Sequence, residues 1–445
     1  MPDGSGQLQP FLEQALAGAS SFAGAGTGWV DALRKAGADA YAAHGLPGRR
    51  DEYWRYTNLN ALAEGSFTLA GTVADVALPE LPLAGANTLA GARIVVVDGR
   101  MRPDLSDLGG LPDGVDVESL DAVLAAAPDR LEPWLGRAVR LADMPMAALN
   151  TAFLRDGVVI TVENGILLNA PIHLVSLTTA GGGMVQPRHL VVLGAGASVK
   201  LIETHIGLSD EGGFSNIVSE VFLGEGARLD HFVFQNESMA RVHLSGAAVE
   251  IAECASYNSF VLQSGGLIGR NEIRAYLNGP GADCKLDGVY MGTDRQVLDN
   301  TTFVEHAAPE CVSRQVYKGV LDGQSRGVFQ GKVHVVRDAQ KTDGHQLSRA
   351  LLLSPGAEID ARPELEIYAD DVKCSHGATA GELDEDLLFY LLSRGIPRSQ
   401  ARQMLIGAFL SEAIAEIPVA EVAEDFTAHV HDWLERHIDA VGEGR

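Results

Sequence analysis

A cysteine and a histidine lie close together near the start of the last quarter of the chain. Residues 370–379 read DDVKCSHGAT, so Cys374 and His376 are separated by one residue and follow Asp370 and Asp371. Residues two apart on an extended strand project from the same face, which predicts a thiol and an imidazole side by side. Thiolate and imidazole suit iron and other thiophilic metals. We therefore expect the chemistry of the protein in this segment.

The spacing of Cys374 and His376 does not by itself define a metal site. A C-x-H pair is more often a small buried thiol beside a hydrogen-bonded imidazole than a pair of metal ligands. Two ligands are too few for a closed site, so others would come from elsewhere in the chain or from another chain. Further candidates are His306, His334 and His345, each of which alone is more typical of a surface or core histidine.

Composition limits the expected partners. The 445 residues include 34 Lys and Arg against 59 Asp and Glu, which gives a formal net charge of −25. An acidic surface repels nucleic acid and anionic membranes, so a protein or a metal ion is the better candidate. No apolar run of membrane-spanning length and no signal-peptide pattern is visible. The four cysteines form no C-x-x-C pair, which indicates a cytoplasmic protein with reduced thiols.

Motifs for two other kinds of chemistry are missing or ungrouped. The Gly331-Lys332 pair is followed by Val333 and lacks the first glycine of a P-loop, so we expect no nucleotide on this chain. A polysaccharide lyase or hydrolase would need grouped carboxylates, and it remains an alternative of low rank. Its candidate acids, which no spacing groups, are Asp294, Asp299, Glu305 and Asp322.

The middle of the chain predicts an all-β body. Between about 156 and 368, short alternating or β-branched runs follow one another and are separated by Gly, Asn and Asp. A Gly-Ala pair precedes an alternating strand at Gly196, Gly226, Gly281 and Gly356, with spacings of 30, 55 and 75 residues. These spacings suit multiples of a coil of about 25–30 residues. In a parallel β-helix, Gly permits the tight corner and Ala fits the crowded inside, whereas a β-sandwich is the alternative.

Helical segments flank this β body. We divide the chain into an N-terminal helical and mixed domain (1–150), a β-helix core (151–375) and a C-terminal helical domain (376–445). The C-terminal part predicts three helices, the first with Asp384 as N-cap and Gly395 as its stop. We expect these helices to cover the open end of the β body.

An aromatic cluster marks the N-terminal part. Tyr53, Trp54 and Tyr56 lie within four residues of one another. Large aromatic side chains of this kind are expected to pack the N-terminal helices onto the β body.

Two segments resemble a known family. Residues 365–396, which read LEIYADDVKCSHGATAGELDEDLLFYLLSRGI, closely resemble the C-terminal signature of the SufD branch of the SufB/SufD family of the SUF iron–sulfur cluster assembly system. Residues 49–59, which read RRDEYWRYTNL, resemble an N-terminal motif shared by both branches. SufB-type relatives carry a C-G-A-H-T segment where this chain has C-S-H-G-A-T, which favours the SufD branch. A SufB-like subunit that itself holds the cluster is the alternative.

The resemblance implies a fold and a set of partners. The fold would be a right-handed parallel β-helix core flanked by N-terminal and C-terminal helical domains. The chain would be a non-catalytic scaffold subunit that pairs with a SufB-like paralogue, or with itself through a β-helix edge when isolated. A SufC-like ABC ATPase would dock on the C-terminal helices and hydrolyse the ATP.

The resemblance also implies a site. His376 matches the family's histidine at the interface between the two paralogues, where a transient iron or nascent iron–sulfur cluster is built. It is therefore the expected metal ligand, and Cys374 is expected to support it. A few interfacial ligands bind iron reversibly and let a cluster leave, whereas a four-cysteine cage would retain it.

Overall fold

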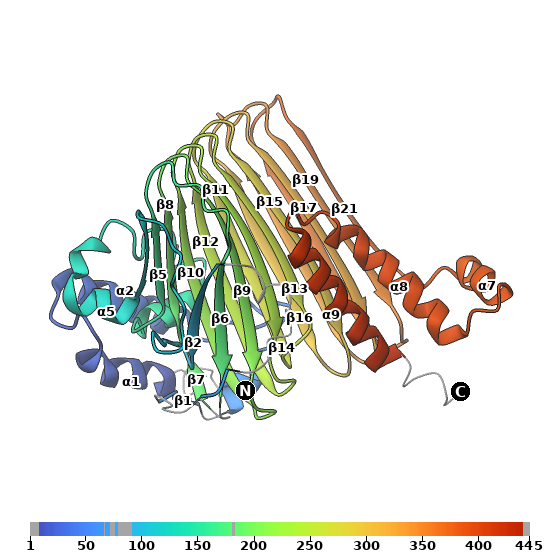
Figure 1. Cartoon of the computed structure of the whole chain (residues 1–445), viewed down its shortest axis with the longest axis horizontal. Helices are drawn as coiled ribbons and strands as arrows, with labels where there is room; N and C mark the ends of the chain where they lie inside the picture. Colours follow the sequence, from blue (N-terminus) through green and yellow to red (C-terminus); the bar gives the residue numbers. More distant parts are fainter. Residues whose placement is uncertain (1–8, 66, 72–75, 79–90, 180–182, 439–445) are drawn as a thin grey trace.

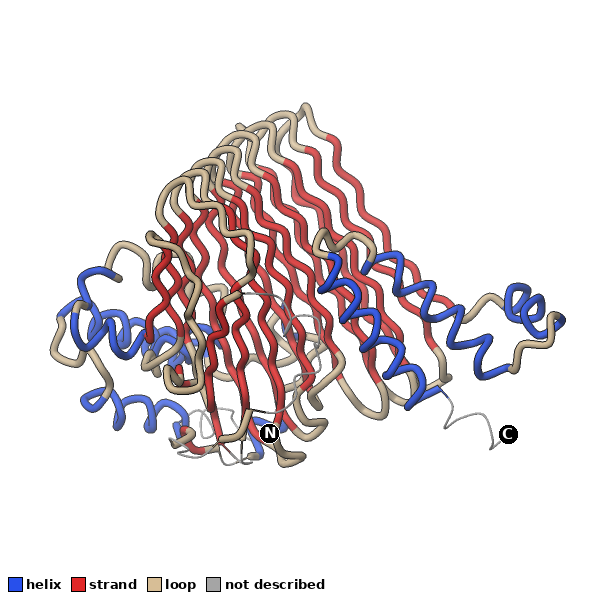
Figure 2. Tube along the Cα trace, in the orientation of Figure 1, coloured by secondary structure: helices blue, strands red, loops and turns tan. Residues whose placement is uncertain are grey.

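Two large β-sheets face each other along most of the chain. The computed structural model describes residues 9–65, 67–71, 76–78, 91–179 and 183–438. Strands alternate between the sheets, so that each coil contributes one strand to each of them (Figures 1 and 2). Their turns stack in a row along the upper edge of the molecule in Figure 2. The prediction of a parallel β-helix flanked by helices is confirmed, and the β-sandwich alternative is wrong.

Sheet A has eleven strands within the described residues. In spatial order its main path is β20 (Glu358–Ile367), β18 (Arg326–Val335), β16 (Val297–His306), β14 (Ile268–Leu277), β12 (Arg241–Ile251), β10 (Gly213–Leu223), β8 (Arg188–Leu193), β5 (Val158–Val162) and β4 (Val115–Ser119). Two short strands lie off this path, β7 (Gly183–Val185) against β10 and β1 (Thr68–Leu69) against β7.

Sheet B has ten strands within the described residues. In spatial order they are β21 (Lys373–Gly381), β19 (Asp343–Leu352), β17 (Val312–Leu321), β15 (Asp283–Gly292), β13 (Ser256–Gln263), β11 (Arg228–Asn236), β9 (Ser198–Gly207), β6 (Ile172–Thr178), β2 (Ala92–Val97) and β3 (Arg100–Met101). The strands β2 and β4 come from the region predicted as the N-terminal domain, yet they extend the two sheets.

One corner of the β-helix explains the recurring Gly-Ala pairs. Residues with positive φ recur there every 27 to 31 residues, at Gly165, Gly196, Gly226, Cys254, Gly281, Glu310 and Lys341. The backbone N–H of each donates to a carbonyl oxygen in the next coil, as from Lys341 to Asp371. The repeat is therefore regular, but three of these seven positions are not glycine, so a pattern of glycines alone does not reveal it. Gly356 belongs to the opposite corner, where a Cβ would lie 2.7 Å from the carbonyl oxygen of Gly323.

The alanines of these Gly-Ala pairs lie between the two sheets, as predicted. Ala197, Ala227 and Ala282 are fully buried in the main core cluster between the sheets. The inward side chains of successive coils stack because the strands pair in register, and this stacking produces one continuous apolar interior.

Helices from the first part of the chain pack on the outer face of sheet A. They include α1 (Gln9–Gly18), α2 (Gly28–His44), α3 (Asn60–Glu64), α5 (Leu120–Ala126) and α6 (Pro145–Ala152), with short 3-10 turns η2 (Ala19–Ser21), η3 (Glu52–Trp54) and η4 (Pro128–Arg130). Tyr41 and Phe153 of this region share a cluster with Phe214 and Leu244 of sheet A.

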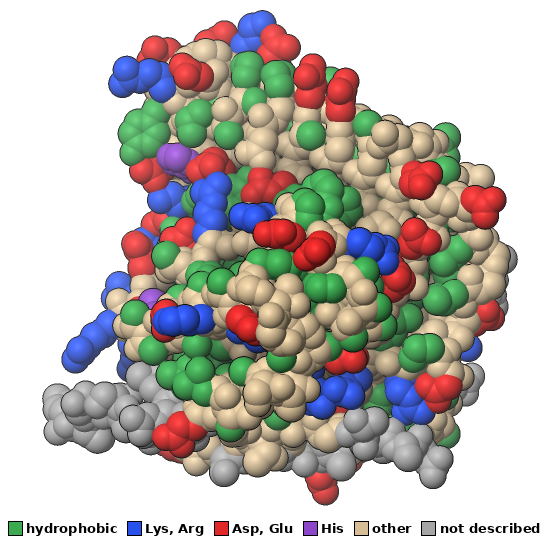
Figure 3. Space-filling model, turned by 90° about the vertical axis from the view of Figure 1, so that its left-hand side faces the viewer, with side chains coloured by type: hydrophobic (Ala, Val, Ile, Leu, Met, Phe, Trp, Pro, Cys, Tyr) green, Lys and Arg blue, Asp and Glu red, His purple; other side chains and the backbone are tan. Residues whose placement is uncertain are grey.

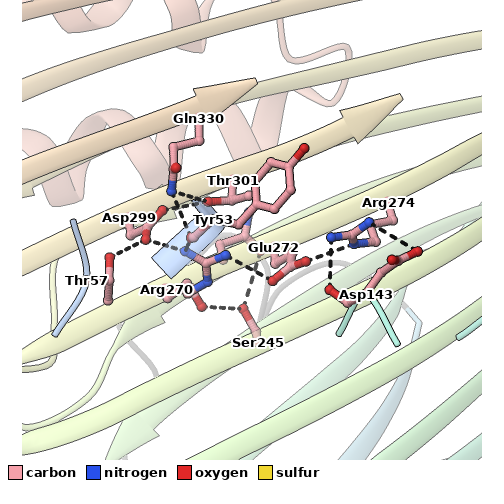
Figure 4. Close-up of polar contacts among 11 residues, drawn as sticks. Tyr53, Thr57, Asp143, Ser245, Arg270, Glu272, Arg274, Asp299, Thr301 and Gln330 are labelled. Carbon is pink, nitrogen blue, oxygen red and sulfur yellow. Dashed lines mark hydrogen bonds and ion pairs between the residues drawn. The ribbon is translucent and has the colours of Figure 1, made fainter. Parts of the chain in front are cut away.

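The motif at residues 49–59, which we call the strap, lies against the outer face of sheet A, and Figure 4 shows its Tyr53 and Thr57 beside Arg270 and Asp299. The guanidinium group of Arg270 lies 4.0 Å from the centre of the Trp54 ring, donates to the carbonyl oxygen of Tyr53, and pairs with Asp299. Thr57 donates a second hydrogen bond to Asp299. The prediction that this aromatic cluster joins the N-terminal region to the β body is therefore confirmed for Tyr53 and Trp54.

The C-terminal helices do not cap the β-helix, contrary to the prediction. The helices are α7 (Glu385–Ser393), α8 (Arg398–Ile414) and α9 (Ala420–Ile438). Figure 1 shows α8 and α9 lying across sheet B, and their apolar side chains bury Phe234 and Phe260 of its outer face. This arrangement arises because sheet B carries large apolar residues on its outer face, which need a cover.

The last coil is left open as a result. No residue of β20 or β21 is buried. The chain leaves β21 at Gly381 and α7 begins at Glu385, so the predicted start of the helical domain at residue 376 falls within the last strand. Asp384 caps α7 by accepting from the N–H groups of Asp386 and Leu387, as predicted.

Candidate functional site

The last strand, β21, carries both residues of the predicted site. Cys374 is in register with Gly344 of β19, and His376 is in register with Gln346. A Cβ on Gly344 would lie 3.5 Å from the Cys374 Sγ, so the thiol is on the inner face of the sheet. Gln346, the register partner of His376, directs its amide between the sheets, so His376 projects from this inner face as well. The predicted common direction is confirmed.

Cys374 and His376 nevertheless have different surroundings. Cys374 is half-buried and packs with Val333, Val335 and Leu365. Burial raises the pKa of its thiol, which disfavours the thiolate that metals bind. His376 is exposed, and no group in the described residues is bonded to its imidazole. The imidazole is thus the accessible group of the pair.

The two acids of the motif lie apart from this inner face. Asp370 and Asp371 are exposed at the corner that precedes β21. The backbone of Asp371 completes the corner ladder, because its carbonyl oxygen accepts from Lys341 and its N–H donates to Gln340. These residues therefore shape the turn into β21.

The other candidate histidines are dispersed. His306 is buried inside, bonded to Ser313, and burial lowers its pKa to about 4. His334 lies on the outer face of sheet A, 3.1 Å from the Glu305 carboxylate. Neither has a contact that brings it to β21. Across the described residues, no group of three or more His, Cys, Asp or Glu side chains could hold a metal ion.

The third histidine supports β21 from the outer face of sheet B. The Nδ1 of His345 is hydrogen-bonded to the Oγ of Ser375, between Cys374 and His376. Its Nε2 lies 2.8 Å from Asp343, which is also 2.8 Å from Arg314. These contacts link the neighbouring strands β17 and β19 to β21, the strand of the motif. The sequence gives no signal for it, since the register of distant strands is needed to see it.

The candidate acids of a polysaccharide enzyme do not form a catalytic pair. Asp299 is buried in its ion pair with Arg270, and Glu305 is six residues further along the same strand, which corresponds to about 20 Å. Asp294 and Asp322 lie at the opposite corner, where Asp322 accepts from Ser354. Paired carboxylates in such enzymes are about 5–10 Å apart.

A second polar cluster lies inside the first coils and was not predicted. Glu203 lies between two histidines, 2.9 Å from Nε2 of His205 and 3.0 Å from Nε2 of His231. Burial opposes the ionisation of Glu203, yet the two neighbouring imidazoles hold its pKa well below its usual range. Its only signal in the sequence is the alternation of Glu203 and His205 on one strand.

The C-terminal helix α7 presents an apolar surface. Leu387, Phe389 and Tyr390 are more than half exposed, and Phe389 reaches 70%. The helix contacts α8 and projects away from the β body in Figure 1. By contrast, the N-terminal end of the molecule, viewed in Figure 3, mixes acidic and basic side chains with small apolar areas.

The helices give no sign of a membrane segment. None of those in the described residues is both long enough and apolar enough to cross a bilayer.

Comparisons with known proteins agree with this architecture. A family model described as the SufBD core domain of SUF-system FeS cluster assembly matches residues 176–409, and a model of the SufBD N-terminal region matches residues 21–174. An iron–sulfur cluster assembly SufBD family protein of Synechocystis is 33% identical over 94% of this chain and 92% of its own. The iron–sulfur cluster assembly protein SufD of Escherichia coli is 33% identical over 83% of this chain and 84% of its own. The chain therefore belongs to the SufBD family of iron–sulfur cluster assembly proteins and is SufD-like.

Proposed function

We propose that the chain is a non-catalytic scaffold subunit that helps to build and transfer nascent iron–sulfur clusters together with a SufB-like paralogue and a SufC-like ABC ATPase. The observation that supports this most is the open last coil, in which the exposed His376 sits on a strand with no buried residue. A metal-binding imidazole at an uncovered end is suited to a site that two chains complete together.

The open coil supports pairing with another β-helix. The outermost strands, β20 and β21, each end a sheet and leave backbone N–H and C=O groups available for a further strand. Such edges favour pairing between chains. A paralogue with an equivalent last coil would continue both sheets, and a second copy of this chain would do so when the paralogue is absent.

His376 would serve as one ligand for iron or for a nascent cluster, which is cargo rather than a resident cofactor. The described residues hold no complete ligand set, which agrees with a site between two subunits where the paralogue would supply the other ligands. Few ligands favour release of the cluster to a recipient. Cys374 would support the strand by packing, since its thiol is half-buried and its pKa is raised.

The ATPase would dock on the C-terminal helices. The exposed Leu387, Phe389 and Tyr390 of α7 form an apolar surface of the kind that a partner covers. The next helix, α8, is fixed to the last coils of sheet B, where Lys318 of β17 pairs with Glu412 and donates to the carbonyl oxygen of Phe409. Movement of the ATPase would therefore reach the strands beside β21.

Co-expression with the two partners tests this proposal. The wild-type chain should co-purify with both partners, and the purified complex should assemble a cluster from iron and a sulfur donor. His376→Ala should leave the complex assembled and lower the yield of cluster. His334→Ala, on the outer face of sheet A, is the matched control and should keep the yield. Isolation of the chain as a lone sugar-cleaving enzyme, or full cluster yield in His376→Ala, would refute the proposal.

A further inference from the structure

A glutamine stands directly behind His376 on the inner face of sheet B. Gln346 of β19 is in register with His376 of β21, so the two side chains occupy neighbouring positions in one column. A Cβ on Gly331 of the facing sheet would lie 2.9 Å from the Gln346 Nε2, which places this amide in the space between the sheets. The side chain of Gln346 therefore points inward at the level of the coil that supports the last one.

The amide of Gln346 has no hydrogen-bond partner. The residue is 3% exposed, and neither its Nε2 nor its Oε1 is bonded to any group in the described residues. An unpaired buried polar group destabilises the fold, so such a group calls for a partner such as water or a ligand. A leucine or methionine at this position would avoid the cost altogether.

The Gln346 amide has different neighbours on its deeper side and on the side of the open end. On the deeper side the space is filled by the buried rings of Tyr317 and Phe329, whose centres are 5.1 Å apart. The next glutamine in the column, Gln315, accepts a hydrogen bond from Thr302 through its Oε1, and only its Nε2 is unpaired, whereas both polar atoms of Gln346 are. On the outer side, the next residue of the column is the exposed His376. Beyond His376 no further strand of sheet B follows among the described residues, so a ligand for Gln346 can approach past His376.

From this geometry we infer that Gln346 is the second polar group of the cargo site, and that its amide hydrogen-bonds the sulfide or the iron-bound thiolate of a nascent cluster held by His376. This inference rests on the proposed function. The carboxamide has an N–H donor for a sulfur atom and a carbonyl oxygen that can accept from a water on iron. Hydrogen bonds to the sulfurs adjust the stability and potential of a cluster.

The test compares matched variants in the complete complex with both partners. Gln346→Met keeps the length of the side chain and removes its polar atoms, and Gln346→Asn keeps the amide but withdraws it. Gln315→Met is the control, because Gln315 is a buried glutamine of the same column one coil deeper. Thermal unfolding, co-purification of the partners and the yield and lifetime of the reconstituted cluster are measured for each.

If Gln346 binds the cargo, its replacement should stabilise the chain and at the same time destabilise the cluster. Gln346→Met should raise the unfolding midpoint of the apo chain by about 1–2 °C, because it removes an unpaired buried amide. It should also shorten the lifetime of the cluster about 10-fold, the usual effect of losing a supporting hydrogen bond. Gln346→Asn should lie between, and Gln315→Met should keep the wild-type lifetime.

Two results would overturn the inference. A wild-type cluster lifetime in Gln346→Met, or a loss of partner binding in that variant, would show that the amide serves the chain or the partner instead of the cargo. His376→Ala separates this inference from the proposal on which it rests. If His376→Ala abolishes the cluster and Gln346→Met does not affect it, the role of Gln346 fails alone. If His376→Ala also has no effect, the proposed site fails as well.

Discussion

The ammonium group of Lys318 on β17 lies against the carboxylate of Glu412 on α8 and donates to the carbonyl oxygen of Phe409, 2.8 Å away. Lys318 is almost fully buried, whereas the side chain of Glu412 is 66% exposed. The same nitrogen is 4.8 Å from the centre of the Phe409 ring. Lys318 thus adds a polar attachment of α8 to sheet B beside the apolar contact between them.

Removing this lysine should loosen α8. Lys318→Met keeps most of the apolar stem but loses a charge-assisted hydrogen bond, at a cost of about 1–3 kcal/mol. We expect faster hydrogen exchange across α8 and weaker binding of the ATPase. Glu412→Gln is the control and should change little, because Lys318 retains the Phe409 carbonyl. Equal effects of the two substitutions would assign the attachment to the exposed ion pair.

The outer-face chain of side chains should hold β21 in place. Ser375→Ala and His345→Gln each remove the hydrogen bond between β19 and β21 on that face. Both should increase hydrogen exchange in β21 without altering exchange in sheet A. His334→Gln should leave β21 unchanged. Unaltered β21 exchange in both variants would show that backbone pairing alone fixes the strand.

The buried ion pair beneath the strap across sheet A should be costly to break. Arg270→Met would leave the buried carboxylate of Asp299 without its cation, at a cost of about 3–5 kcal/mol in chemical unfolding. Arg362→Met breaks a pair with Glu52 that lies at the surface, and it should cost about 0–1 kcal/mol. Similar costs for the two variants would contradict a buried network.

Buried histidines should make the fold sensitive to mild acid. Burial lowers the pKa of His173, His189, His306 and His429 to about 4. The unfolded chain therefore binds more protons than the folded chain between about pH 6.5 and 4, and stability falls as the pH is lowered through that range. Burial raises the pKa of Asp287 to about 6 and also raises the pKa of Asp156, Glu250, Asp283 and Asp360, which acts in the opposite direction, and we expect the four histidines to outweigh these carboxyls.

Urea unfolding at several pH values checks this prediction. The unfolding free energy should fall from pH 7 to pH 4.5, and His306→Gln should reduce the slope. A free energy that stays level over this range would contradict it.

Cys374 should be a packing residue. Cys374→Ala removes a half-buried sulfur from a small apolar cluster and should cost about 1–2 kcal/mol in unfolding. Cluster formation in the complex should remain well above that of His376→Ala. A loss as large as that of the histidine variant would make Cys374 a ligand.

The β-helix was predictable because its repeat leaves local marks, and the gaps in that repeat have a physical cause. Gly196, Gly226 and Gly281 take positive φ at one corner, but Cys254 and Glu310 take the same conformation without being glycine. A pattern based on glycine therefore does not detect the intervening coils. The inward direction of the buried alanines was predictable, since alternation along a strand is a local property.

Placement of the C-terminal helices could not be predicted from their own pattern. Their apolar faces required a cover, and the sequence does not say whether that cover is the end of the β-helix or the outer face of sheet B. The helices cover sheet B because Phe234 and Phe260 point outward from it, and the direction of these side chains depends on strand register. The same limit applies to Gln346 and His345, which meet the motif only through pairing between β19 and β21.

The uncovered last coil has a consequence for the timing of iron capture. Strands with no buried residue open easily, so β20 and β21 should fray in a solitary subunit and become rigid only when a neighbour covers them. Before that moment the inward imidazole has no fixed surroundings and would hold iron poorly. Under the proposed role of His376, an unassembled subunit would bind little iron, and iron binding would begin only when a neighbouring subunit covers the last coil.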